Sequence, residues 1–238
     1  MSLFQFKQFA INHDKSTIKV GTDAVLLGAW TPIAPECEHV LDIGSGCGVI
    51  TLMLAQRSNA YITGIDIDKQ SVEEAVENAN KSPFANRIEF INLPIQDFCI
   101  SENKNKFDLI VSNPPFFVNS LKSPIYKRNI GRHTDTLSFE ELILAVNYCL
   151  SSLGLFAVII PIAAKENIEN LCEKQGLFCK NILQIQPLEN KPANRAILLF
   201  SREEKELQTE NLIIRDTSTK YTIAYQSLTK NFYLKNEL

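Results

Sequence analysis

The chain has 238 residues, of which 45% are hydrophobic and 21% are charged, and its formal net charge is -3. This length fits one large α/β domain, and the composition excludes extended disorder. The small negative charge excludes a protein that binds nucleic acid over its whole surface, so any site for a polyanion must be local.

The cysteines and the N-terminal residues bear on cofactors and compartment. Six cysteines lie at residues 37, 47, 99, 149, 172 and 179, without a Cys-x-x-Cys pair. This spacing predicts neither a zinc site nor a disulfide framework, and it favours a reducing compartment. The N-terminal residues lack the features of a signal peptide, and nowhere do 18 apolar residues run together. We therefore expect a cytoplasmic monomer without a metal and without a membrane segment.

Short apolar runs alternate with segments of helical periodicity through most of the chain. We expect strands at residues 39–43, 61–65, 87–92, 107–111, 155–160, 182–186 and 195–200, and helices at 49–57, 70–79, 138–150 and 164–174. This alternation is typical of a Rossmann-like, doubly wound α/β fold with a mainly parallel sheet. The last two strands are predicted to form an antiparallel hairpin at one edge. We divide this single domain, residues 1–238, into an N-terminal segment (1–35), a Rossmann-like core (36–201) and a C-terminal extension (202–238).

Polar residues in two helices and one connection have local interpretations. In the helix at 70–79 we assign one apolar and one solvated face, with Val72, Ala75, Val76 and Ala79 on the first and Glu73, Glu74 and Glu77 on the second. Ser138, with Glu141 three residues later, predicts a capping box. Residues 201–209 are interpreted as a charged surface connection.

A glycine-rich turn follows the first strand of the predicted core. Gly44, Gly46 and Gly48 let the backbone turn tightly and approach a ligand without a Cβ in the way. Asp66 ends the next strand, 22 residues after Gly44, and its carboxylate suits the two hydroxyls of a ribose. Position 49 is Val49, not the third glycine of a dinucleotide fold, and no Gly-Lys-Ser/Thr follows. The turn therefore predicts a nucleoside ligand without a phosphate chain.

The pattern Asp-x-Gly-x-Gly-x-Gly at residues 42–48, with an acid at the end of the next strand, resembles motifs I and II of class I S-adenosylmethionine-dependent methyltransferases. The resemblance implies S-adenosyl-L-methionine as cofactor. It places Asp42 at the methionine end, where Asp42 would also stabilise the turn. It assigns Asp97 to the adenine amine, with Phe98 packing nearby, and the alternative for Asp97 is a helix N-cap.

A second motif follows the strand at 107–111. Asn-Pro-Pro-Phe at residues 113–116 resembles motif IV of methyltransferases that modify planar amino nitrogens, namely adenine N6, cytosine N4 and the glutamine amide. Such an amine is a poor nucleophile because its lone pair is delocalised. The Asn113 side-chain oxygen and the Pro114 carbonyl would each accept one amine hydrogen, which places the nitrogen in line with the methyl group. Phe116 offers a flat face for stacking the base.

Further stretches narrow the choice of amine to adenine in RNA. Residues 8–11, 19–30, 113–119, 132–133 and 137–142 resemble the tRNA1(Val) (adenine(37)-N6)-methyltransferase family, and this resemblance covers nearly the whole chain. It implies tRNA as the partner and adenine 37, beside the anticodon, as the target. No extra N-terminal helical domain precedes the first stretch, as glutamine methyltransferases acting on release factors would have. Thr22 and Asp23 are expected to help close the cofactor pocket or to cap the helix that they begin.

The segment after the motif has a local excess of positive charge. Residues 113–134 contain no Asp or Glu. The residues that we assign to RNA binding are Lys122, Lys127, Arg128, Arg132 and His133. Phosphate contacts would make binding sensitive to salt, and an anticodon-loop base is easily splayed out. The alternative is a solvated loop.

Two other functions remain open from the sequence. One is methylation of a glutamine in a protein such as a release factor. The other is a non-catalytic RNA-binding module that retains a methyltransferase fold, although Asp42, Gly44, Asp66 and Asn113 are all present.

Overall fold

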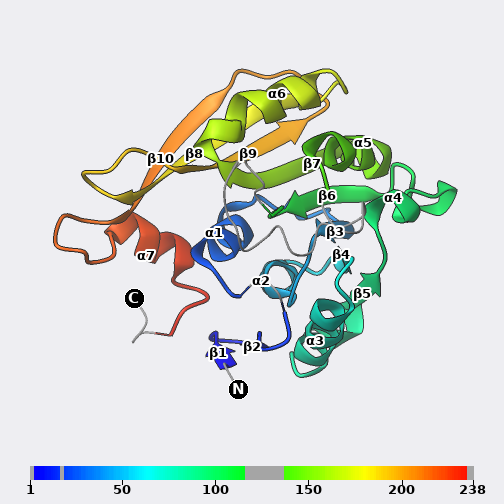
Figure 1. The fold of residues 1–238 in the computed structure, drawn as a ribbon, viewed down its shortest axis with the longest axis horizontal. Helices are drawn as coiled ribbons and strands as arrows, with labels where there is room; N and C mark the ends of the chain where they lie inside the picture. The colour runs from blue at the N-terminus through cyan, green and yellow to red at the C-terminus, as the bar shows by residue number, and fades with distance from the viewer. Residues whose placement is uncertain (1–2, 17–18, 116–136, 235–238) are drawn as a thin grey trace, which may run out of the picture.

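The structure is a computed structural model that describes residues 3–16, 19–115 and 137–234 (Figure 1). Its strands are β1 (Leu3–Gln5), β2 (Ala10–Asn12), β3 (His39–Ile43), β4 (Tyr61–Asp66), β5 (Ile88–Asn92), β6 (Phe107–Ser112), β7 (Leu150–Pro161), β8 (Phe178–Leu188), β9 (Arg195–Ser201) and β10 (Gln208–Arg215). Its α-helices are α1 (Thr22–Trp30), α2 (Val49–Arg57), α3 (Lys69–Asn80), α4 (Ile95–Phe98), α5 (Phe139–Cys149), α6 (Lys165–Glu173) and α7 (Ile223–Thr229).

Eight strands form one sheet in the order β10-β8-β9-β7-β6-β3-β4-β5, and β1 pairs with β2 separately. Strand β9 runs antiparallel to both neighbours, and the other ladders of the large sheet are parallel. The mainly parallel, doubly wound fold is thus confirmed, as is the antiparallel pairing of the late strands. Their position at the edge is wrong, because β10 continues the sheet beyond β8. The first four residues of β10 are exposed, so its sequence lacks the apolar run that marks a buried strand.

Helices cover both faces of the sheet (Figure 1). One core cluster joins α1, α2 and α7 to the sheet, and a second joins α4, α5 and α6 to its other face. Neighbouring residues of one strand therefore enter different cores, as Val40 and Leu41 of β3 do. Burial on both faces explains why the central strands are almost continuously apolar.

Helix α3 departs from the amphipathic pattern predicted for it. Val76 is 38% exposed, whereas Glu74 is only 2% exposed. The assignment of Glu74 to a solvated face is therefore wrong. The N-terminal segment covers this side of the helix, and its backbone donates hydrogen bonds to the Glu74 carboxylate. Glu73 and Glu77 are exposed as expected.

The predicted capping box at the start of α5 is confirmed. The Ser138 hydroxyl accepts a hydrogen bond from the Glu141 backbone N–H at 3.2 Å, and the Glu141 carboxylate accepts one from the Ser138 N–H at 2.9 Å. Both bonds satisfy backbone donors that the first helical turn leaves without a partner.

Candidate active site

The glycine turn and the Asn-Pro-Pro motif begin side by side at the carboxyl edge of the sheet. Ile43 of β3 is paired with Ser112 of β6, and the buried Ser112 hydroxyl donates to the Ile43 carbonyl at 2.8 Å. Gly44 and Asn113 are the next residues of the two strands. Ligands of open α/β sheets bind at this edge, in the crevice between such strand ends. The fold thus brings together the two motifs that the sequence assigns to cofactor and target amine.

The three glycines of the turn all have positive φ, at 77°, 52° and 84° for Gly44, Gly46 and Gly48. A Cβ added at Gly48 would lie 2.7 Å from the Phe90 ring, so packing requires this glycine. A Cβ added at Gly44 or Gly46 would meet no described atom within 4 Å. These two glycines therefore border open space that a ligand can enter.

Asp66, at the end of β4, is tied to the glycine turn. Its carboxylate accepts hydrogen bonds from the backbone N–H of Gly46 at 2.8 Å and of Asp68 at 2.9 Å. Burial raises its pKa, and these backbone bonds act in the opposite direction. A third backbone bond comes from Ile67, and the carboxylate still keeps a lone pair for a ribose hydroxyl. Asn92, at the end of β5, donates to the carbonyls of Asp66 and Ile67, both at 2.9 Å. This residue was not predicted from the sequence, where a polar residue at a strand end would have indicated it.

Asp42 is fully buried beneath the turn. Its Oδ2 accepts from the Thr51 N–H at 3.1 Å and from the Thr51 hydroxyl at 2.6 Å. Burial raises the pKa of Asp42 to about 7, although the Thr51 bonds favour ionisation. Asp42 Oδ1 and the buried Ser45 hydroxyl have no hydrogen-bond partner among the described residues. The Thr51 bonds join the end of β3 to the start of α2 across the glycine turn, which stabilises the turn. Asp42 Oδ1 remains as an acceptor. Thr51 was not predicted, and its signal is a polar residue within the apolar first turns of the helix.

The alternative role of Asp97 as a helix N-cap is wrong. Helix α4 begins after Pro94, which is its N-cap, and Asp97 lies within the first turn with an exposed side chain. This exposed carboxylate, in the helix that follows β5 next to β4, remains available to a ligand. Phe98 is only 6% exposed and packs in the core with α5 and α6.

Thr22 and Asp23 lie in the first turn of α1, but neither caps it. The N-cap is Gly21, and no side chain makes a capping bond there. Asp23 instead forms an ion pair with Arg195, whose Nε lies 2.9 Å from the Asp23 carboxylate. Arg195 begins β9 opposite Pro161 of β7, so this pair spans the carboxyl edge of the sheet.

Several predicted site residues lie outside the described part of the chain. They are Phe116, Lys122, Lys127, Arg128, Arg132 and His133. Asn113 is half-buried and Pro114 is buried. Within residues 3–16, 19–115 and 137–234, no group of three or more His, Cys, Asp or Glu is arranged to hold a metal ion. In the same ranges, every helix is too short or too polar to cross a membrane.

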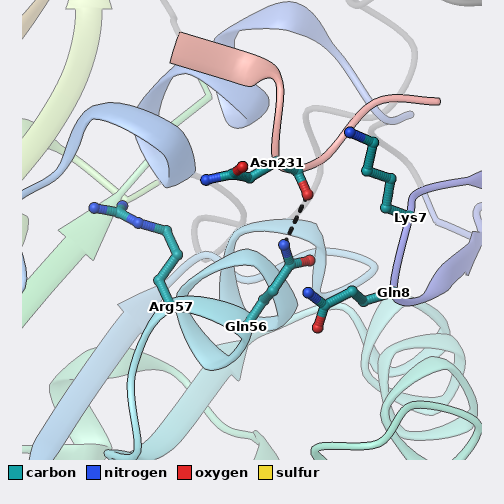
Figure 2. Close-up of a pocket in the computed structure, with 5 residues that line it drawn as sticks. All are labelled: Lys7, Gln8, Gln56, Arg57 and Asn231. Carbon is teal, nitrogen blue, oxygen red and sulfur yellow. Dashed lines mark hydrogen bonds between the residues drawn. The ribbon is translucent and has the colours of Figure 1, made fainter. Parts of the chain in front are cut away.

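A surface pocket of about 480 Å³ lies away from this site (Figure 2). It is lined by Lys7, Gln8, Gln56, Arg57 and Asn231. Gln56 and Arg57 end α2, whereas the glycine turn precedes its first residue, so the pocket is at the opposite end of this helix. Gln56 donates to the Asn231 carbonyl at 2.9 Å, which ties the C-terminal segment to α2. We interpret the pocket as a packing seam between these segments.

Comparison with known proteins identifies the family. The model of the methyltransferase domain matches residues 36–221. A tRNA1(Val) (adenine(37)-N6)-methyltransferase of Bacteroides fragilis is 43% identical over 235 residues, which cover 98% of each chain. This chain belongs to the tRNA1(Val) (adenine(37)-N6)-methyltransferase family. A member from Pectobacterium carotovorum is 40% identical, over 97% of this chain and 93% of its own.

Solved structures agree on the fold of this family member. A predicted O-methyltransferase of Agrobacterium tumefaciens aligns with a TM-score of 0.68 at 19% identity, covering 88% of this chain and 96% of the other. P. horikoshii TYW2 in complex with MeSAdo aligns with a TM-score of 0.59 at 16% identity, covering 84% and 70%. At these identities the likeness concerns the class I methyltransferase fold.

The cofactor of this methyltransferase is S-adenosyl-L-methionine, and the residues at the carboxyl edge fit it. The space beside Gly44 and Gly46 is open to a ligand. Asp42 Oδ1 is a buried acceptor without a partner among the described residues, which suits the ammonium of a methionine moiety. The Asp66 carboxylate suits ribose hydroxyls.

Proposed function

We propose that this protein transfers a methyl group from S-adenosyl-L-methionine to N6 of adenine 37 in tRNA1(Val). The observation that carries the proposal is the position of Asn113 and Pro114, which directly follow Ser112 beside the glycine turn. The curated relatives, at 39–43% identity over nearly the full chain, are named for this activity.

The chemistry asks the protein to position an unreactive amine. S-adenosyl-L-methionine supplies a methyl group on a sulfonium, which keeps the electron pair of the broken S–C bond. The N6 lone pair forms the new N–C bond, and one N6 proton is lost to solvent. The Asn113 side-chain oxygen and the Pro114 carbonyl accept the two amine hydrogens, which favours the pyramidal nitrogen that attacks. Phe116 stacks the adenine ring.

We assign the cofactor contacts to the residues around the crevice. Gly44, Gly46 and Gly48 form the turn that the cofactor approaches. Asp66 binds the ribose, Asp97 the adenine amine, and Asp42 the methionine end. Thr22 and Asp23 close the pocket from α1. Support comes from the open space at the turn and from the exposed Asp97 carboxylate.

The tRNA contacts are assigned to the basic segment that follows the motif. Lys122, Lys127, Arg128, Arg132 and His133 are proposed to bind phosphates around the anticodon loop. We further propose that residues 1–238 act as one domain, since β10 of the C-terminal extension joins the central sheet. A cytoplasmic monomer fits a tRNA substrate and six free cysteines.

The test compares purified wild-type protein with Asn113→Ala, using labelled S-adenosyl-L-methionine and tRNA from a strain that lacks the gene. We expect methyl transfer to fall on the order of 10²- to 10³-fold, because one positioning acceptor is lost, with cofactor affinity retained. Asn59→Ala, at an exposed residue, is the matched control and should stay fully active. Full activity of Asn113→Ala would refute the motif assignment.

Further measurements on the same proteins distinguish the proposed function from the two alternatives. Mass spectrometry of digested tRNA should show N6-methyladenosine at position 37 only with active protein. Methyl acceptance by a protein such as a release factor, but not by tRNA, would replace the proposal with glutamine methylation. Binding of tRNA without binding of S-adenosyl-L-methionine would replace it with a non-catalytic RNA-binding role.

A further inference from the structure

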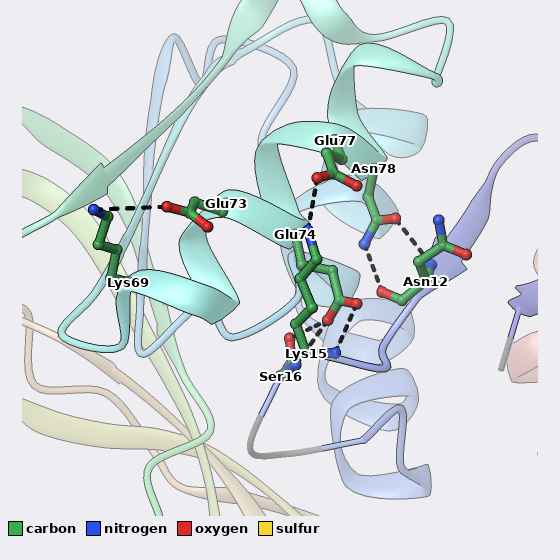
Figure 3. Close-up of polar contacts among 8 residues, drawn as sticks. All are labelled: Asn12, Lys15, Ser16, Lys69, Glu73, Glu74, Glu77 and Asn78. Atoms are coloured by element: carbon green, nitrogen blue, oxygen red, sulfur yellow. Dashed lines mark hydrogen bonds and ion pairs between the residues drawn. The ribbon is translucent and has the colours of Figure 1, made fainter. Parts of the chain in front are cut away.

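Helix α3 carries a buried carboxylate that the chemistry above does not use (Figure 3). Glu74 Oε1 accepts the Lys15 backbone N–H at 3.0 Å. Its Oε2 accepts the Ser16 N–H at 2.9 Å and the Ser16 hydroxyl at 2.6 Å. Desolvation opposes ionisation, but these hydrogen bonds prevail and lower the pKa of Glu74. A charged carboxylate thus fixes residues 15–16, and among the described residues it forms no ion pair, because the Lys15 ammonium pairs with Glu77.

Asn78, one turn further along α3, contacts Asn12 of the same segment (Figure 3) and also bonds to the glycine turn. Its side chain is buried, and its Oδ1 accepts the Asn12 N–H at 2.9 Å. Its Nδ2 donates to the carbonyls of Asn12 and Cys47, both at 2.9 Å. Cys47 lies between Gly46 and Gly48. One amide therefore ties the end of β2 to the turn that borders the cofactor space.

The segment held in this way leads directly into α1. His13 Nδ1 accepts the Val20 N–H at 2.9 Å, which closes the chain on itself between β2 and the helix. Gly21 follows as the N-cap, and Thr22 and Asp23 form the first turn. Contacts of α3 with residues 12–16 thereby limit where this first turn can stand.

We propose that Glu74 and Asn78 are positioning residues for the cofactor, which hold the segment leading to α1 against the glycine turn. The two walls of the S-adenosyl-L-methionine pocket then keep a fixed separation. This inference rests on the proposed function, because it assigns the cofactor to these walls. Neither side chain touches the cofactor; both act through the backbone of residues 12–16 and of Cys47.

The test measures S-adenosyl-L-methionine binding by calorimetry and tRNA methylation kinetics for Glu74→Gln and Asn78→Ala. We expect the cofactor Kd and KM to rise about tenfold in each variant, a change of the size of one hydrogen bond. At saturating cofactor, kcat and the KM for tRNA should stay at the wild-type values. Glu73→Gln is the matched control, since it removes the same charge from an exposed site of the same helix.

A milder variant keeps the test decisive if either substitution prevents folding. Ser16→Ala removes the 2.6 Å bond to Glu74 and the contact of the Ser16 hydroxyl with the Cys47 thiol, and it should raise the cofactor Kd by a smaller factor. A lower unfolding temperature with an unchanged cofactor Kd would overturn the proposal, as would a loss confined to kcat. Calorimetry needs no tRNA, so weaker cofactor binding by the variants would support this inference even if tRNA methylation failed.

Discussion

Gly44 and Gly176 both have a left-handed backbone conformation, but they lie at opposite edges of the sheet. Their φ angles are 77° and 69°, and an added Cβ would meet no described atom within 4 Å at either. Gly44 borders the crevice, whereas Gly176 lies between α6 and β8, at the opposite edge of the sheet. Substitutions at these two glycines therefore distinguish the effect of backbone strain from the effect of filling ligand space.

We predict that Gly44→Ala and Gly176→Ala each lower the free energy of unfolding by about 1 kcal/mol, since a left-handed residue gains a Cβ. Only Gly44→Ala should also weaken S-adenosyl-L-methionine binding, by about tenfold or more, because the methyl group occupies ligand space. Urea unfolding and calorimetry measure the two effects. Equal cofactor affinity in both variants would show that Gly44 does not border the cofactor.

The pKa of Asp42 has a consequence for stability. Its value is 3.8 in a free side chain and about 7 in the fold, because burial disfavours the charged form. Between these pH values the unfolded chain gives up a proton that the folded chain keeps. The contribution of Asp42 to the free energy of unfolding must therefore fall as pH rises from about 4 to about 7, and stay constant above.

We predict that Asp42→Asn abolishes this part of the pH dependence. Urea unfolding of wild type and variant across the interval gives the difference in slope. Asn59→Ala, at an exposed residue without a charge, should retain the wild-type slope. A slope that is the same in Asp42→Asn and wild type would mean that Asp42 is ionised in the fold.

At the scale of elements, the caps and burial of single helices are testable. Helix α5 begins with the Ser138–Glu141 capping box and buries Leu142, Ile143 and Val146 against the sheet. The box satisfies the backbone N–H groups of Ser138 and Glu141 at the start of the helix. Packing of the apolar face fixes the rest of the helix.

Ser138→Ala should lower the free energy of unfolding by about 1 kcal/mol, the usual cost of losing an N-cap. Ser227→Ala, at an exposed serine inside α7, supplies the control and should change stability little. Chemical denaturation measures both. The cap would be dispensable if the two variants unfolded at the same denaturant concentration.

At the scale of the whole molecule, the two ends of the described chain meet. The Lys7 N–H donates to the Phe232 carbonyl at 2.8 Å, and Phe6 stacks on Phe9 with centroids 4.6 Å apart. Tyr233 lies 6.0 Å from Phe6 in a stacked arrangement. Together with β10, these contacts make the C-terminal extension part of the fold.

A chain ending at Glu206 would lose β10 and α7 and leave β8 as an open edge. We expect it to aggregate, because the open edge and the uncovered aromatic cluster are both prone to association. A chain ending at Leu234 is the control and should remain monodisperse. Light scattering after size-exclusion chromatography compares the two chains. A monodisperse short chain would show that the core does not need the C-terminal extension to stay soluble, and would contradict the prediction.

The sequence predicted secondary structure well where the pattern depends on residues that are close together in the chain. The strand at 39–43, the helix at 49–57 and the capping box at Ser138 match the structure, because periodicity and capping depend on near neighbours. Strands β1, β2 and β10 and helix α7 were not predicted. The first two strands have three residues each, and β10 has an exposed first half.

The sequence by itself determined the fold class, the family and the identity of the two motifs, since spacing and residue type carry that information. Only the tertiary structure decided that Glu74 is buried, that Asp23 pairs with Arg195 and that Asn78 joins the N-terminal segment to the glycine turn. These contacts link residues far apart in the chain. The free energy of a polar side chain depends on the groups that fold around it, and no local pattern specifies them.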